Sequence, residues 1–255
     1  AHCCTNILVS KGASADNSTQ LSYNADSGSL YGSLGLYPAA DHPAGSVREI
    51  WDWDGSFYLG SIPEVPHTYN VVGNANEHGL IIGETTFGGI ASLGGGGTSA
   101  IMDYGSLIWV TLQRAKTARE AISIMDELCQ TYGYASEGES FSLADGDEVW
   151  LMELIGKGKQ KGAVWVAMRV PDGYIGSTAN QARITTFPRN DPDSCLYAKD
   201  VVSFAQQQGL YPKNAPEDAF SFSDTYDPVT FGGVRLGEAR VWNIFQPASG
   251  GAFSE

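Results

Sequence analysis

The sequence predicts an α+β fold in which helices flank paired antiparallel sheets. Alternating apolar and polar segments, broken by turn residues, fill residues 4–89 and 140–185, with two helical patterns between them and a third after them. Neither a repeated strand–helix–strand order nor a repeat of fixed period is present. A sheet layer cannot bury both of its faces alone, so two packed sheets covered by helices are expected.

The first β region is predicted to consist of hairpins. Residues 4–12 (CTNILVSKG) indicate a strand that closes in a turn, and residues 18–26 resume a looser alternation, so the two are expected to pair. Residues 48–63 indicate two strands around an Asp-Gly dipeptide, which is favoured in tight hairpins. Residues 68–89 indicate a strand, a polar turn and a second strand.

Two helical patterns follow. Residues 103–118 carry apolar residues at helical spacing. Residues 117–133 give the stronger pattern: Thr117 is a candidate N-cap, Glu120 stands three residues later as in a capping box, and Gly133 ends the segment.

The second β region begins with residues 140–156, which predict a hairpin around a second Asp-Gly dipeptide. Residues 162–170 and 173–185 continue it as further strands, and residues 198–209 predict a helix. Gly- and Ser-rich residues 246–255 predict a flexible tail or a truncation point.

Composition excludes several classes of protein. The 255 residues carry a net charge of −14 and contain no Lys/Arg cluster, so nucleic acid is not an expected partner. No run of about 18 apolar residues predicts a membrane span. The chain starts with Ala rather than Met, which fits a mature form after signal removal and favours a secreted or periplasmic location.

Familiar catalytic and cofactor motifs are missing. There is no GxGxxG, no GxxxxGK[ST], no HExxH and no GxSxG, so neither a nucleotide cofactor nor a nucleophile elbow is expected. Four histidines occur without metal-ligand spacing, which predicts neither metal nor other cofactor: His2, His42, His67 and His78.

Cys4 stands directly before the first predicted strand, and this placement suits one particular chemistry. A cysteine that becomes the first residue of a chain carries its own base, because an α-amino group has an unperturbed pKa near 7.7–8.0. A strand that begins at once supplies a rigid support for the nucleophile.

The sequence resembles the C69 dipeptidase family, cysteine N-terminal-nucleophile (Ntn) hydrolases related to secernins, choloylglycine hydrolases and penicillin V acylases. The resemblance spans nearly the whole chain, in order, and implies a four-layer αββα sandwich, a dipeptidase activity on a small peptide substrate, and no cofactor. It is carried by CTNILVSKGASADNST, YNADS, NVVGNANEHGLIIGETTFGG, IMDYGSLIWVTLQRAKTAREAI, GESFSLADGDEVWLMEL, STANQARIT and EARVW.

The resemblance also implies how the chain is organised. Residues 1–3 match a leader that is removed, residues 4–245 match the Ntn-hydrolase domain, and the family's greater length implies a C-terminal segment absent from this sequence. A homo-oligomer is possible.

The resemblance assigns the nucleophile to Cys4 rather than Cys3. Asp26 in YNAD matches a carboxylate that, in related acylases, sits beside the nucleophile's amine. Those acylases place Arg where this chain has Tyr23, a departure that argues against a bile-salt-type site and leaves Tyr23 as a substrate-binding candidate.

Further site residues follow from HGLIIGETTFGG and STANQAR. Thr86 aligns with one oxyanion-hole position, through its hydroxyl or its backbone N–H, and Asn180 with the other. Glu84 and Thr85 are candidates for binding a dipeptide's free amine, since an ammonium requires a carboxylate; a structural ion pair is the alternative for Glu84.

An arginine is expected to fix the substrate carboxylate in a bidentate pair. The resemblance favours Arg235 for this role, with Arg240 as the alternative.

Two alternative functions stay open at this point. One is an Ntn amidase acting on a non-peptide N-acyl bond. The other is a non-catalytic domain that stacks sugars on exposed aromatics, although these side chains are expected to be core residues of a hairpin: Trp51, Trp53, Tyr58 and Tyr69.

Overall fold

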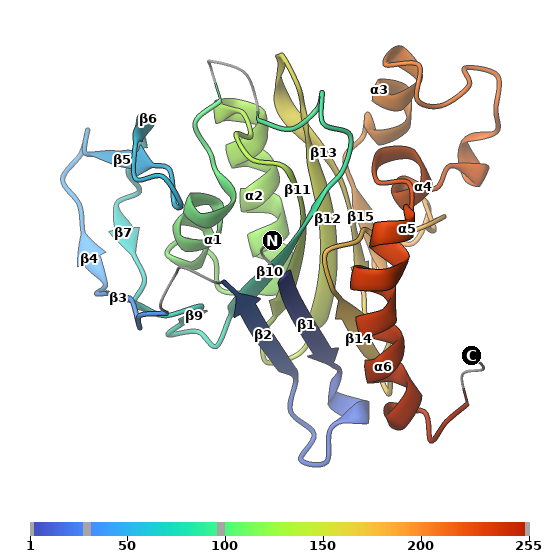
Figure 1. Cartoon of the computed structure of the whole chain (residues 1–255). Helices are drawn as coiled ribbons and strands as arrows, with labels where there is room; N and C mark the ends of the chain where they lie inside the picture. Colours follow the sequence, from blue (N-terminus) through green and yellow to red (C-terminus); the bar gives the residue numbers. More distant parts are fainter. Residues whose placement is uncertain (1–2, 28–31, 96–99, 253–255) are drawn as a thin grey trace.

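Two antiparallel sheets lie against each other in the computed structural model, which describes residues 3–27, 32–95 and 100–252 (Figure 1). The larger sheet contains, in spatial order, β15 (Cys195–Tyr197), β13 (Gln160–Arg169), β12 (Val149–Lys157), β11 (Gly138–Ala144), β10 (Ile81–Gly88), β9 (Ala75–Asn76), β8 (Val71–Val72) and β3 (Leu36–Tyr37). The smaller sheet is ordered β14 (Ile175–Thr178), β1 (Cys3–Val9) and β2 (Gln20–Asp26). Two separate hairpin sheets are formed by β4 (Ala40–Asp41) with β7 (His67–Thr68) and by β5 (Val47–Trp51) with β6 (Tyr58–Pro63).

The sheets meet through alternate side chains of β1. Asn6 and Leu8 are fully buried, and Leu8 packs with Ala144 of β11 and Val149 of β12. A Cβ on Gly83 of β10 would lie only 3.0 Å from the Tyr23 Cβ of β2, so a larger residue would crowd the contact between the sheets at this position.

Helices cover the other face of the larger sheet. α1 (Tyr104–Leu112) and α2 (Ala118–Tyr132) pack on this face, where the main hydrophobic core lies (Figure 1). The remaining helices are α3 (Val201–Gln207), α4 (Phe222–Tyr226), α5 (Phe231–Gly233) and α6 (Ala239–Ala248), with 3-10 turns at Lys11–Ala13 and Glu217–Ala219 and a π-helical turn at Val234–Glu238. No helix within the described ranges has both the length and the apolar character that a bilayer crossing requires.

Helix α6 contacts the smaller sheet from the side away from the larger one. Arg240 donates to the Cys4 carbonyl at 2.6 Å and to the Thr5 hydroxyl at 2.8 Å. Residues 4 and 5 of a strand point to opposite faces. The Thr5 contact therefore places α6 on the outer face, while the Cys4 side chain faces inward.

Several local predictions are confirmed. β1 pairs with β2, and β5 with β6, as the hairpin patterns indicate. Thr117 caps α2 by accepting a hydrogen bond from the Glu120 N–H at 3.2 Å, and Gly133 ends it with a φ of 76°. The Glu120 carboxylate accepts from the N–H of Lys116, one residue before the cap, rather than from Thr117 itself.

Other expectations are wrong. α1 ends at Leu112 rather than near 118, and α6 runs through Ala248, so residues 246–248 are helical; residues 1–2 and 253–255 lie outside the described part.

Three of the aromatic residues expected in a core are roughly half exposed, because the β5–β6 hairpin belongs neither to the larger nor to the smaller sheet: Trp51 at 49%, Trp53 at 45% and Tyr58 at 52%. Tyr69 is partly buried.

We expect Asp145→Ala to lower the free energy of unfolding by about 2–3 kcal/mol, measured by urea denaturation. The Asp145 carboxylate accepts the N–H of Ala118 at the start of α2 and the N–H groups of Asp147 and Glu148, each at 2.8 Å. The neighbouring Asp147, whose side chain is 87% exposed, provides the matched control, and Asp147→Ala should change stability by less than about 1 kcal/mol. Equal losses from the two substitutions would contradict this account of the turn.

Candidate active site

Cys4 is buried near the start of β1, the central strand of the smaller sheet, with 6% of its surface exposed. Its backbone N–H donates to the Asn180 side-chain oxygen at 2.7 Å, and its sulfur lies 3.8 Å from Glu84 Oε1. Its carbonyl accepts from Arg240. The nitrogen, carbonyl and sulfur of Cys4 therefore each face a defined partner.

Asn180 follows β14 in the left-handed region, with a φ of 55°, which Asn tolerates better than most residues. Its nitrogen donates to the Thr86 carbonyl at 2.7 Å, while its oxygen also accepts from Arg240 at 2.9 Å. The side-chain amide is thus held with its oxygen toward Cys4 and its nitrogen toward β10.

The structure brings Arg240, the alternative arginine, to Cys4. Its Nη2 also donates to the Ala179 carbonyl, and its Nε to the Leu236 carbonyl. Arg235, favoured by the sequence, is exposed on the π-helical turn and forms no hydrogen bond or ion pair with the described residues.

β10 carries three of the predicted residues, on two faces. Beyond Ile82 this strand is an edge of the larger sheet in the described part of the chain, since β9 pairs with it only at Ile81. Glu84, 3% exposed, accepts from the Tyr23 hydroxyl at 2.5 Å. Thr85 is fully buried and bonds the Thr178 hydroxyl at 3.0 Å between the sheets, so it lies apart from Glu84 and does not join its contacts.

Thr86 faces the same side as Glu84, and its hydroxyl donates to Glu139 Oε1 at 2.6 Å. Glu139 lies opposite Thr86 on β11, is 1% exposed and was not singled out from the sequence. Burial, and then the charge of Glu84, raise the pKa of Glu139 well above its usual range.

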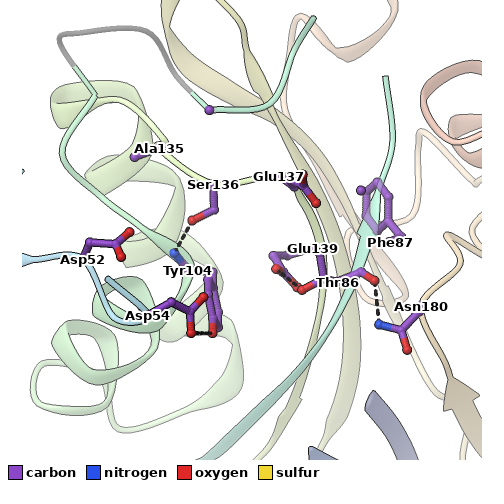
Figure 2. Close-up of a pocket in the computed structure, with 12 residues that line it drawn as sticks. Asp52, Asp54, Thr86, Phe87, Tyr104, Ala135, Ser136, Glu137, Glu139 and Asn180 are labelled. Carbon is purple, nitrogen blue, oxygen red and sulfur yellow. Dashed lines mark hydrogen bonds between the residues drawn. The ribbon is translucent and has the colours of Figure 1, made fainter. Parts of the chain in front are cut away.

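A cavity of about 540 Å³ opens beside this group. Figure 2 shows Thr86 and Glu139 facing each other, with Asn180 on one side and Tyr104 and Asp54 on the other. Four carboxylates and no Lys, Arg or His are among its described lining residues: Asp52, Asp54, Thr86, Phe87, Gly88, Gly95, Tyr104, Ala135, Ser136, Glu137, Glu139 and Asn180. An acidic concave surface concentrates cations.

The Cys4 thiol is held in its protonated form. Burial, followed by the charges of Glu84 and Glu139, raises its pKa to about 12. The three described histidines contact Thr68, Asp41 and Tyr69 rather than Cys4. Within the described ranges, therefore, no imidazole is placed to serve as the base that would convert this sulfur into a nucleophile.

Asp26 lies opposite Cys3 in the β1–β2 register and thus flanks the Cys3–Cys4 bond. Its side chain is exposed and accepts from the Asn24 side chain at 2.8 Å. Strand alternation directs it to the sheet face opposite to that of the Cys4 sulfur.

Comparison with known proteins adds an independent finding. The sequence model of peptidase family C69 matches residues 3–249. "Probable dipeptidase" of Salmonella dublin is 28% identical over 256 residues, covering 94% of this chain and 57% of that protein. "Dipeptidase A" of Lactobacillus helveticus is 26% identical over 270 residues, covering 97% and 55%. The chain spans about half the length of the curated relatives it matches.

We expect Glu84→Gln to speed alkylation of Cys4 by iodoacetamide at pH 8 roughly tenfold, because removing the adjacent anion lowers the thiol pKa and raises the thiolate fraction. Peptide mass spectrometry resolves Cys4 from the buried Cys129 and Cys195, which act as internal references. Glu137→Gln, an exposed substitution in the same cavity, is the matched control and should leave the rate unchanged. An unchanged rate in Glu84→Gln would show that this carboxylate does not govern the thiol.

Proposed function

The chain belongs to peptidase family C69, and from this premise we propose that it is the catalytic part of a hydrolase that cleaves the peptide bond of dipeptides. The observation that carries the proposal is the environment of Cys4. Its nitrogen lies 2.7 Å from the side-chain oxygen of Asn180, which lines an acidic cavity. The dipeptidase names of the relatives from Salmonella dublin and Lactobacillus helveticus support the choice of substrate.

We further propose that the fold is the four-layer αββα sandwich of Ntn hydrolases. The layers would be α1 with α2, the larger sheet, the smaller sheet and α6. Contacts of α2 with β13, of β1 with β10 and of α6 with β14 support this order.

In the proposed mechanism, the Cys3–Cys4 bond is cleaved and the nitrogen of Cys4 becomes a free amine. Asn180 Oδ1, which now accepts from the amide N–H, would orient that amine. With an unperturbed pKa near 7.7–8.0, the amine takes the thiol proton as sulfur attacks the substrate carbonyl. It then protonates the leaving nitrogen, and water hydrolyses the thioester. Asp26, which flanks the same bond, is proposed to assist the amine.

Asn180 is proposed as the main hydrogen-bond donor to the oxyanion of the tetrahedral intermediate. Its Nδ2 carries two hydrogens, and one of them is bonded to the Thr86 carbonyl. The Thr86 hydroxyl donates to Glu139, so this hydroxyl serves the oxyanion only after leaving that carboxylate.

Arg240 is proposed as a positioning residue rather than as a binder of the substrate carboxylate. A guanidinium has five N–H donors. The five acceptors in the structure are the Cys4, Ala179 and Leu236 carbonyls, the Thr5 hydroxyl and the Asn180 side-chain oxygen. No donor of Arg240 is left for a substrate.

The cavity charge favours dipeptides over the substrates of related amidases. Penicillin V and conjugated bile salts are anions, which carboxylates at Asp52, Asp54 and Glu137 repel. A dipeptide carries an ammonium group that the same carboxylates attract.

We expect Cys4→Ala to lower kcat for dipeptide hydrolysis by at least about 10³-fold, because no other group can form the thioester. Ninhydrin or chromatographic assay of released amino acids measures the rate. Cys195→Ala is the control: this thiol is buried, its nearest hydrogen-bond acceptor is its neighbour's carbonyl, and its removal should leave kcat within about twofold. Full hydrolysis by Cys4→Ala would rule out the proposed nucleophile.

A further inference from the structure

Two buried carboxyl groups meet beside Cys4 on neighbouring strands of the larger sheet. Glu84 is 3% exposed and Glu139 is 1% exposed. Each Oε1 accepts from one hydroxyl, that of Tyr23 at 2.5 Å for Glu84 and that of Thr86 at 2.6 Å for Glu139. Each Oε2 is buried with no hydrogen-bond partner among the described residues. We call these two groups the carboxyl pair.

Among the residues that the structure describes, no cation faces the carboxyl pair. Glu139 lies opposite Thr86, and Glu84 lies two residues before Thr86 on the same face of β10, so the two side chains are diagonal neighbours on adjacent strands. The titratable groups that face it from the neighbouring elements are a thiol, three phenols and a further carboxylate: Cys4 on β1, Tyr23 on β2, Tyr104 on α1, Tyr134 after α2 and Glu137 before β11. None of these carries a positive charge.

Two neighbouring buried carboxyl groups cannot both be ionised without a compensating cation. In the empty site Glu139, whose pKa burial and the charge of Glu84 raise well above its usual range, therefore holds a proton. Glu139 also lines the cavity (Figure 2), so a cation that enters from solvent reaches the pair directly.

We propose that the carboxyl pair binds the free α-ammonium group of the peptide substrate in exchange for the proton on Glu139. This inference rests on the proposed dipeptidase function and names the group of the substrate that the site recognises. The ammonium brings one positive charge and three N–H donors, and the displaced proton passes to solvent. The pair then carries two negative charges beside one bound cation, so charge and protons balance.

Binding there sets which bond is cut. In a peptide the α-nitrogen and the first carbonyl carbon are attached to the same Cα. Because the Cys4 sulfur lies 3.8 Å from Glu84 Oε1, an ammonium on the carboxyl pair places the carbonyl of the first residue at the sulfur. The first residue would form the thioester, and peptides with a blocked amino terminus would be excluded.

Isothermal titration calorimetry of the full chain carrying Cys4→Ala tests the exchange without turnover. L-leucyl-L-alanine is titrated at pH 7 in phosphate and in Tris, whose ionisation enthalpies differ, so the number of protons released is measured. We expect about one proton per bound peptide, and no binding of N-acetyl-L-leucyl-L-alanine. Adding Glu139→Gln should abolish proton release and weaken binding at least tenfold. Adding Glu127→Gln, a matched change at an exposed position of α2 outside the cavity lining, should leave proton release intact.

Binding without proton release, or equal binding of the N-acetylated peptide, would overturn the inference. Hydrolysis by the wild-type chain separates this failure from failure of the proposed function. If neither peptide is cut, the dipeptidase proposal fails. If both are cut with equal kcat/KM, only the ammonium site fails. Should Glu139→Gln not fold, as judged by circular dichroism, the comparison of free and N-acetylated peptides on the other two proteins decides the matter.

Discussion

Strand β1 is hydrogen-bonded on both edges, to β2 and to β14, and the arrangement of the site depends on this constraint. A strand held on both sides cannot shift its register without turning every side chain to the other face. Cys4 is therefore directed inward to the edge of β10, while Thr5 is directed outward to Arg240. The loop after β14 brings Asn180 to the backbone of the same residue. One pairing thus places the candidate nucleophile, the amide that orients it and the arginine that holds both.

Electrostatics divide this site into two halves. On the outer side of β1, Arg240 supplies a cation whose donors are all used within the protein. On the inner side, Glu84 and Glu139 are acidic, and no cation of residues 3–27, 32–95 or 100–252 faces them. The Cys4 thiol faces the inner half, so its ionisation is opposed in the empty site. In the proposed mechanism, such a site stays unreactive until the Cys4 amine is free to act as a base.

Local signals in the sequence predicted local features well. The Thr117 cap, the hairpins and the strand at Cys4 depend on neighbouring residues, which a single sequence displays. Glu139 could not be found in this way: GESFSL alternates like a strand with one exposed face, yet every residue of β11 is buried because both faces of the larger sheet are covered. The resemblance favoured Arg235 over Arg240, whereas the structure places Arg240 at Cys4, because the position of both depends on a π-helical turn that no local pattern reveals. Glu84 and Thr85 have different partners because adjacent strand residues face opposite sides of a sheet. Only the open edge of β10, which the sequence does not reveal, brings Cys4 to Glu84.

The central claim is that Cys4 acts with its own free amine. A thiol reagent that reacts with Cys4 labels the active molecules, and the labelled fraction is compared with the activity lost. Intact-mass analysis of the labelled molecules then tests this claim directly. The account predicts that every trapped, active molecule begins at Cys4, with the Cys3–Cys4 bond cleaved. Full activity in molecules that retain the Cys3–Cys4 bond would contradict it, because an amide nitrogen cannot accept the thiol proton.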